Sequence, residues 1–326
     1  MKCDVLCLRP RADFERVGEL APASLNVLYR SPNDADVPQL LKTASALLIP
    51  AVGPKLPPEL FADTSVTFVQ VTGAGMDRLD RSTLQRLGIA VANVPGGSNR
   101  AVAEYAVTAA SLLLRRLSWA DSEIHAGNYA TFRARMLADN LSGLESLLVG
   151  IVGFGVIGAA VADLFHMLGC RICYYDPAPA NRDAAEALGA KSMSLAELLQ
   201  SADIVTLHVP LIPATHSLIG EPELAIMRTG AILIQASRGG VVDESALAKH
   251  LQSGRIGGAA VDVYTTEPPT ADNPLLVLSG EARQRLLLTP HIAGVTRQSA
   301  ASLFRSAWQN LERVLIQKQP PLNRAY

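Results

Sequence analysis

Short runs of apolar residues alternate along the chain with stretches in which apolar positions recur at helical spacing. In the first part, the runs typical of strands span residues 3–8, 46–49, 66–71 and 89–91. In the second part, they span residues 148–152, 171–175, 203–209, 231–235, 256–261 and 286–288. Strands that alternate with helices form parallel sheets covered by helices on both faces, so the pattern predicts an α/β fold.

Two long helical segments bear on the domain organisation. Residues 101–117 are almost all apolar, and such a helix must be buried, which we expect between domains or between subunits. Residues 298–316 have one apolar face and can run back to the first part of the chain. A chain of 326 residues suits two domains. We therefore expect a discontinuous domain of residues 1–100 plus 295–326, and a second domain of residues 101–294.

Composition and charge narrow the possible partners. Apolar residues make up 49% and charged residues 18%, which allows a large packed core. The formal net charge is −1 and no long basic run is present, so electrostatics give no reason to expect nucleic acid or an anionic membrane as a partner. Residues 147–162 lack charge, but they are shorter than the roughly 20 residues of a membrane helix and are interrupted by glycines.

Cysteine usage bears on metal binding and location. The chain contains Cys3, Cys7, Cys170 and Cys173. The last two have CxxC spacing, but they fall in a predicted strand, where side chains three positions apart point to opposite faces. No second pair completes a zinc site, so we expect core cysteines and no metal. Reduced cysteines, and an Asp4 that interrupts any signal-peptide pattern, indicate a cytoplasmic protein.

A glycine-rich turn follows the predicted strand 148–152 and opens a predicted helix, with the sequence Gly153-Phe154-Gly155-Val156-Ile157-Gly158. The first glycine permits a tight turn, the second leaves room for a pyrophosphate, and the third lets the helix pack closely on the sheet. The N-terminus of the helix then offers free N–H groups to the phosphates. The turn therefore predicts a dinucleotide site. The alternative is a glycine turn in an unrelated strand–helix unit.

Asp176 points to the kind of dinucleotide. It ends the next predicted strand, 176 − 158 = 18 residues after the last glycine, close to the spacing of about 20 for a ribose-binding acid. Its carboxylate would accept from the 2′-hydroxyl of NAD and repel the 2′-phosphate of NADP, and the nearest downstream arginine is Arg182. We therefore expect NAD as the cofactor, with a surface cap as the alternative role of Asp176.

Three polar residues, Arg238, Glu267 and His291, each follow a further predicted strand, and ligands of open α/β sheets bind at the carboxyl ends of strands. A histidine can take the hydroxyl proton of a secondary alcohol as the hydride leaves. A carboxylate beside it orients the ring and favours the imidazolium that protonates the keto oxygen in reverse. An arginine binds an anionic acid with a planar pair of donors. Together they predict a site for a hydroxy or keto acid.

Each of these residues also has a structural alternative. An arginine after a strand is usually ion-paired or solvated, a Glu-Pro is usually a turn, and a single histidine is more often structural than catalytic. Asp262, at another strand end, would either bind the nicotinamide carboxamide or cap a turn. His208 is expected to line the cofactor. The other histidines are expected to be structural, superficial or in loops: His125, His166, His216 and His250.

The motifs together resemble the D-isomer-specific 2-hydroxyacid dehydrogenase family over nearly the whole chain. They lie at residues 152–158, 207–211 with Thr215, 236–243, 260–263, 267–268 and 289–294. The resemblance implies two Rossmann-like, doubly wound parallel-sheet domains with the active site in the cleft between them. It also implies a homodimer, which we expect to form through the region of residues 101–117.

The resemblance further implies roles for individual residues. His291 would be the acid/base, Glu267 its partner, and Arg238 would hold the substrate carboxylate and the reacting oxygen. Backbone N–H groups of Ala74 and Gly75 would bind the same carboxylate. The cofactor would contact Gly153, Gly155, Val156, Ile157, Gly158, Asp176, Val209, Pro210, Thr215, Ala236, Ser237, Arg238, Asp262, His291 and Gly294.

The predicted function is that of an oxidoreductase that transfers a hydride between NAD(H) and a small 2-hydroxy or 2-keto acid, for example as a glyoxylate or hydroxypyruvate reductase. Ala74 stands where phosphite dehydrogenase carries lysine, and Pro290 where formate dehydrogenases carry glutamine, which argues against both activities. The loop 279–285 is longer than is usual in the family. The alternative is an NAD-sensing binding protein without catalysis, because corepressors of this fold keep the same active-site residues.

Overall fold

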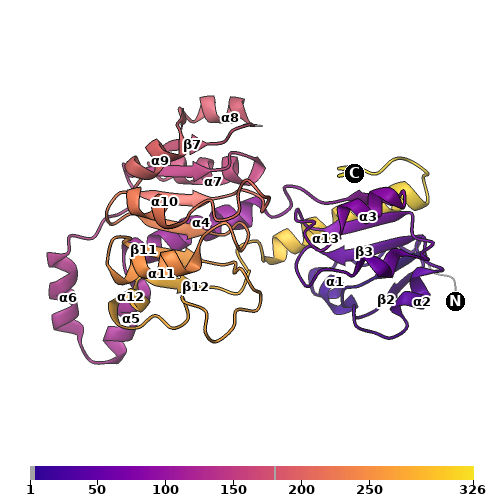
Figure 1. Cartoon of the computed structure of the whole chain (residues 1–326), viewed down its shortest axis with the longest axis horizontal. Coiled ribbons are helices and arrows are strands. Elements are labelled where there is room, and N and C mark those ends of the chain that lie inside the picture. Colours follow the sequence, from indigo (N-terminus) through magenta and orange to yellow (C-terminus); the bar gives the residue numbers. More distant parts are fainter. Residues whose placement is uncertain (1–3, 180) are drawn as a thin grey trace. The chain divides into compact units, whose positions relative to one another are not determined.

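The computed structural model describes residues 4–179 and 181–326, so Cys3 lies outside the described residues. The chain divides into two compact units, each with its own parallel sheet (Figure 1). The first unit consists of the residues up to Ser98 together with Val295–Tyr326, and the second of Asn99–Gly294. The predicted α/β class with two parallel sheets is confirmed.

The sheet of the first unit has five parallel strands in the order β2-β1-β3-β4-β5. They are β1 (Val5–Cys7), β2 (Val27–Tyr29), β3 (Ala46–Pro50), β4 (Phe68–Thr72) and β5 (Ala90–Ala92). Alternate residues of each strand enter two apolar cores. One core contains residues of α2 (Val37–Leu41), η1 (Pro58–Phe61) and α3 (Arg81–Arg86), and the other contains residues of α1 (Arg11–Val17) and α13 (Arg297–Leu315). The sequence pattern missed β2, whose three residues are only half-buried.

Helix α13 returns the C-terminal part of the chain to the first sheet. The rings of Phe304 and Trp308 lie 4.5 and 5.0 Å from the ring of Phe14 in α1. The buried amide of Asn310 donates to Gln70 Oε1 of β4 at 2.6 Å and to Leu322 O at 3.1 Å, and it accepts from Leu322 N at 2.8 Å. Side-chain hydrogen bonds at a buried position fix the register of the helix on the sheet.

The sheet of the second unit has seven parallel strands in the order β12-β11-β10-β9-β6-β7-β8. They are β6 (Leu148–Val152), β7 (Arg171–Tyr175), β8 (Lys191–Ser192), β9 (Ile204–Leu207), β10 (Ile232–Gln235), β11 (Gly258–Val261) and β12 (Leu286–Leu288). Strand β6 pairs with β7 on one side and with β9 on the other, so the chain reverses its direction of progress across the sheet there. Ligands bind at such a switch point, beside the carboxyl ends of the strands. The two-residue β8 was also missed, because both of its residues are exposed.

Helices cover both faces of this second sheet. The core on one face contains residues of α4 (Asn99–Leu114), α7 (Val156–Met167) and α8 (Arg182–Ala187). The core on the other face contains residues of α9 (Leu195–Ser201), α10 (Glu221–Ile226), α11 (Glu244–Gln252) and α12 (Gly280–Gln284). Helix α12 forms within the loop 279–285 and buries Ala282.

Helix α4 explains the apolar segment predicted at 101–117. Its residues Ala103, Ala106 and Ala110 are buried in the second unit, in a core shared with α7. Our expectation that the segment is buried between domains or subunits is therefore wrong for these residues. The helix ends at Leu114, Arg116 adopts a left-handed φ of 50°, and α5 (Leu117–His125) and α6 (Tyr129–Ala138) follow. In Figure 1, α6 stands away from the sheet of its unit.

Within the described residues, Cys7, Cys170 and Cys173 are buried free thiols, and burial raises the pKa of Cys173 to about 11. The same part of the chain contains no group of three or more metal-ligating side chains. None of its helices has the length and apolar character that a membrane span requires.

Replacing Asn310 by leucine should lower the free energy of unfolding by about 2–4 kcal/mol, because Gln70 Oε1 and the backbone of Leu322 lose their buried partner. Urea denaturation followed by tryptophan fluorescence measures this change. Gln309→Leu, at an exposed position of the same helix, is the matched control and should change stability by less than about 0.5 kcal/mol. Equal losses in the two variants would contradict the importance of the Asn310 hydrogen bonds.

Candidate active site

The glycine turn after β6 has the shape that a pyrophosphate requires. Gly153 has a φ of 93°, and a Cβ added there would lie 2.7 Å from His208 O. A Cβ on Gly158 would lie 2.1 Å from Gly153 O, so only glycine allows α7 to pack this closely. At Gly155, directly before α7, an added Cβ would meet no atom within 4 Å. The turn therefore packs tightly against the protein at Gly153 and Gly158, and it leaves open space beside Gly155.

Asp176 follows β7 and is tied to the glycine turn. Its Oδ2 accepts from Phe154 N at 2.7 Å, and its Oδ1 accepts from Ala178 N at 2.8 Å. The carboxylate therefore caps a turn and also holds the glycine loop. Asp176 and Arg182 both line a pocket of about 410 Å³ on the surface of the second unit.

The segment after β9 lies at the carboxyl end of the sheet, next to the glycine turn. A Cβ on Gly153 would also lie 2.8 Å from Val209 Cγ1, so this segment contacts the glycine turn. Thr215 Oγ1 donates to Pro210 O at 2.5 Å and shapes the loop. His208 Nε2 lies 2.9 Å from Thr206 Oγ1, and burial lowers the pKa of His208 to about 3. This ring is neutral near pH 7 and is unsuited to supply a proton.

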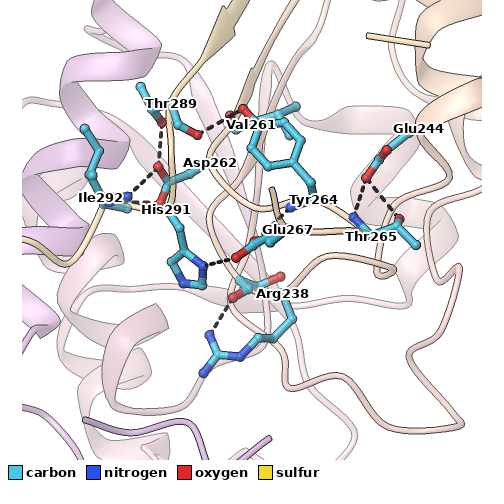
Figure 2. Close-up of polar contacts among 12 residues, drawn as sticks. Arg238, Glu244, Val261, Asp262, Tyr264, Thr265, Glu267, Thr289, His291 and Ile292 are labelled. Carbon is cyan, nitrogen blue, oxygen red and sulfur yellow. Dashed lines mark hydrogen bonds and ion pairs between the residues drawn. The ribbon is translucent and has the colours of Figure 1, made fainter. Parts of the chain in front are cut away.

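His291, Glu267 and Arg238 lie together beyond the neighbouring strands β12, β11 and β10 (Figure 2). His291 Nδ1 lies 2.9 Å from Glu267 Oε2, and both side chains are partly exposed. An ionised carboxylate only accepts hydrogen bonds, so Nδ1 carries the proton of this bond. Nε2 is then the ring atom that can exchange a proton with a substrate.

Arg238 sits on a turn shaped by the buried side chain of Gln235. Gln235 Nε2 donates to Arg238 O at 2.8 Å, and Gln235 Oε1 accepts from Ser237 Oγ at 2.7 Å. Arg238 itself donates to Ser237 O at 2.7 Å. Ala236, Ser237 and Arg238 thus follow β10 as one hydrogen-bonded turn.

Asp262 directly follows β11, and its buried carboxylate holds the turn that carries His291. It accepts from Thr289 Oγ1 at 2.6 Å and from the backbone of Ile292 and Ala293, both at 2.8 Å. His291 N donates to Asp262 O at 2.8 Å, and His291 has a φ of 56°. We considered two roles for Asp262, binding the nicotinamide carboxamide and capping a turn. These contacts are those of a turn cap.

Two tyrosines that the sequence reasoning missed extend this network. Tyr105 OH lies 2.7 Å from Thr289 Oγ1; because Thr289 donates its single hydroxyl proton to Asp262, Tyr105 must be the donor. Tyr264 OH donates to Thr289 O at 3.0 Å, while Tyr264 N donates to Glu267 Oε1 at 3.0 Å. Burial raises the pKa of each tyrosine to about 12, so both hydroxyls keep their protons. Tyr264 therefore connects the Glu267 loop to the His291 loop.

The predicted carboxylate-binding residues Ala74 and Gly75 belong to the first unit, where they follow β4. Ala74 O accepts from Asn93 Nδ2 at 2.7 Å. Thr72 Oγ1 donates to Ile49 O, and the buried Arg78 donates to Pro50 O and Pro54 O. This loop is thus well fixed within its own unit. The cofactor and catalytic candidates of the second unit all come after strands of its one parallel sheet, and Gly294 is the last residue of that unit.

The chain is similar to known proteins in both sequence and fold. Residues 107–293 match the model of the D-isomer-specific 2-hydroxyacid dehydrogenase NAD-binding domain. A glyoxylate reductase of Aeropyrum pernix is 36% identical over 249 residues, which cover 76% of this chain and 72% of the relative. A D-3-phosphoglycerate dehydrogenase of Archaeoglobus fulgidus is 36% identical over 227 residues, which cover 70% of this chain and only 41% of that longer relative.

A solved structure has the same fold over nearly the full length of the chain. The D-lactate dehydrogenase of Aquifex aeolicus, complexed with NAD and lactic acid, superimposes with a TM-score of 0.82 and 25% identity. The superposition covers 98% of both chains. The resemblance inferred from the motifs is confirmed: this chain belongs to the D-isomer-specific 2-hydroxyacid dehydrogenase family, and its residues 107–293 are the NAD-binding domain of that family.

Proposed function

We propose that this protein transfers a hydride between NAD(H) and a small 2-hydroxy or 2-keto acid, glyoxylate and hydroxypyruvate being the first candidates. The observation that carries the proposal is the 2.9 Å contact between His291 and Glu267, with Arg238 beside the pair, at the ligand-binding edge of the NAD-binding domain. Relatives named as glyoxylate reductase and hydroxypyruvate reductase support the choice of substrate.

The cofactor residues of the second unit fit NAD. The open side of Gly155 and the N-terminus of the twelve-residue α7 suit the pyrophosphate. Asp176 retains lone pairs for a ribose hydroxyl, since each of its carboxylate oxygens accepts one backbone hydrogen bond and has room for another. The remaining assigned contacts come from the segments after β9, β10, β11 and β12. When bound, the nicotinamide accepts the hydride of the hydroxy acid or donates one to the keto acid.

Residues of the protein itself transfer the proton and bind the negative charge of the acid. In oxidation, His291 Nε2 takes the hydroxyl proton, and the Glu267 carboxylate at Nδ1 stabilises the imidazolium that forms. In reduction, the imidazolium returns that proton to the keto oxygen. Arg238 offers two parallel donors to the substrate carboxylate, which the backbone N–H groups of Ala74 and Gly75 would also bind. Under this proposal, residues 1–100 with 295–326 form the substrate domain, and residues 101–294 the dinucleotide-binding domain.

We propose a cytoplasmic homodimer. The buried side chains of α4 pack in a core of their own unit. We therefore place the dimer contact, which we expected in the region 101–117, on the helices α5 and α6 that begin at the end of this region. Four large apolar side chains are at least half exposed there: Leu117 at 52%, Ile124 at 52%, Tyr129 at 64% and Leu137 at 65%. The buried free thiols of Cys7, Cys170 and Cys173 suit a reducing compartment, which cell fractionation tests.

The central experiment measures NADH and NADPH oxidation across a panel of 2-keto acids from glyoxylate to phenylpyruvate. We expect turnover with NADH in excess of that with NADPH, and a loss of at least about a hundredfold in His291→Ala, since its general acid is gone. Tight NADH binding without turnover of any panel member would contradict the proposal and favour the NAD-sensing protein.

Replacing Arg238 by lysine keeps the charge but removes the paired donors, so the KM for the keto acid should rise and kcat should fall, by about tenfold each. Steady-state kinetics with saturating NADH measures both. Arg228→Lys, an exposed arginine paired with Asp203, is the control and should keep wild-type kinetics. Unchanged KM and kcat in Arg238→Lys would remove Arg238 from the substrate site.

Light scattering after size exclusion should give twice the chain mass of 34.6 kDa. Replacing Ile124 and Leu137 together by glutamate should yield monomers, because burying two charges in an apolar contact costs several kcal/mol. Leu20→Glu, at a position that is also 52% exposed but lies in the first unit, should stay dimeric. A monomeric wild type would refute the dimer.

A further inference from the structure

Glu244, the first residue of α11, binds the loop that carries Glu267. Its Oε1 accepts from Thr265 N at 2.7 Å and from Thr265 Oγ1 at 3.0 Å (Figure 2). Its Oε2 accepts from Asn273 Nδ2 at 2.6 Å. Thr265 lies two residues before Glu267, and Asn273 lies six residues after it. One carboxylate therefore holds both ends of the segment 265–273.

All three partners of Glu244 are donors, so the position requires a group that only accepts. Asn273 is buried, and its Oδ1 accepts from Leu275 N at 2.9 Å, which fixes the amide with its NH2 towards Glu244. The backbone N–H of Thr265 can only donate a hydrogen bond, so it too needs an acceptor. A glutamine at 244 would turn an NH2 group towards one of these donors, whereas a carboxylate satisfies all of them.

The peptide that Glu244 holds also supports the Arg238 turn. A Cβ added to Gly239 would lie 1.8 Å from Tyr264 O and 2.7 Å from Thr265 N, so the two backbones are in direct contact. On its other side, Tyr264 N donates to Glu267 Oε1. A shift of the Tyr264–Thr265 peptide would therefore move Glu267 relative to His291, and would disturb the support of Arg238.

We propose that Glu244 is a positioning residue that sets the Glu267 carboxylate against His291 without touching the substrate. The proposal rests on the acid/base function proposed for the His291–Glu267 pair. A role limited to capping α11 does not explain these contacts, because the neighbouring Asp243 already caps the helix by accepting from Ser245 N and Ala246 N.

The test compares Glu244→Gln with Asp243→Ala. Among the residues labelled in Figure 2, Glu267, Asp262 and Arg238 are the charged side chains nearest the His291 ring, and Glu267 is hydrogen-bonded to it. If Glu267 moves away, the imidazolium loses its partner and the ring gives up its proton at lower pH. In Glu244→Gln we expect kcat of keto-acid reduction to fall roughly tenfold. The limb of the pH–rate profile where activity is lost with rising pH should move to lower pH by about one unit.

Three further readouts distinguish a positioning role from general damage to the fold. The Kd for NADH should stay within about twofold of the wild type in Glu244→Gln. Glu244→Asp, which is shorter but still only accepts, should recover part of kcat and of the limb position. Asp243→Ala should unfold at a lower temperature and keep the wild-type pH limb. An unmoved limb in Glu244→Gln, or the same loss in both variants, would overturn the proposal.

An NMR titration keeps this test independent of the proposed reaction. The His291 ring signals, identified by their absence in His291→Ala, should titrate at lower pH in Glu244→Gln than in the wild type, in the absence of any substrate. If the wild type turns over no keto acid but this difference appears, the proposed function fails and the positioning role stands. If the wild type is active and the His291 titration is unchanged, the positioning role fails alone.

Discussion

Parallel pairing of the seven strands in the second unit sends all their carboxyl ends to one edge, and the chemistry of the protein depends on this constraint. The glycine turn follows β6, Asp176 follows β7 and His208 follows β9. Arg238, Asp262 and His291 then follow β10, β11 and β12. Residues spread over almost 140 positions of sequence therefore meet because each comes just after a strand. The glycine turn and Asp176 lie on one half of the sheet, and the proton-transfer pair lies on the other.

Buried or half-buried carboxylates fix the loops at this edge. Asp176 holds the glycine turn, Asp262 holds the His291 turn, and Glu244 holds the Glu267 loop, each by accepting from backbone N–H groups. Such charge-assisted bonds are stronger than bonds between neutral groups, so they restrict the movement of three short loops. A rigid His291–Glu267 pair matters because proton transfer requires heavy-atom distances of about 3 Å.

Features that depend on a short stretch of the chain could be predicted from the sequence. The glycine spacing, the acid after β7 and the polar residues after β10 to β12 were all found, because each sits next to a recognisable apolar strand. Strands β2 and β8 were missed because short, exposed edge strands leave little apolar signal. Tyr105, Tyr264 and Glu244 were missed for another reason: their partners lie 184, 25 and 21 or 29 positions away, and no spacing rule connects them. The burial of Ala103, Ala106 and Ala110 was assigned wrongly, because a helix packed against both α7 and the sheet is as apolar as one at an interface.

The most direct test of the account follows the hydride itself. The protein would be incubated with NADH that carries two deuterium atoms at C4 of the nicotinamide and with glyoxylate or hydroxypyruvate, and the product examined by mass spectrometry and NMR. We expect one deuterium per product molecule, bound to C2 of the 2-hydroxy acid, and the D isomer where C2 is a stereocentre. A product without deuterium at C2, or no product from any 2-keto acid, would contradict it.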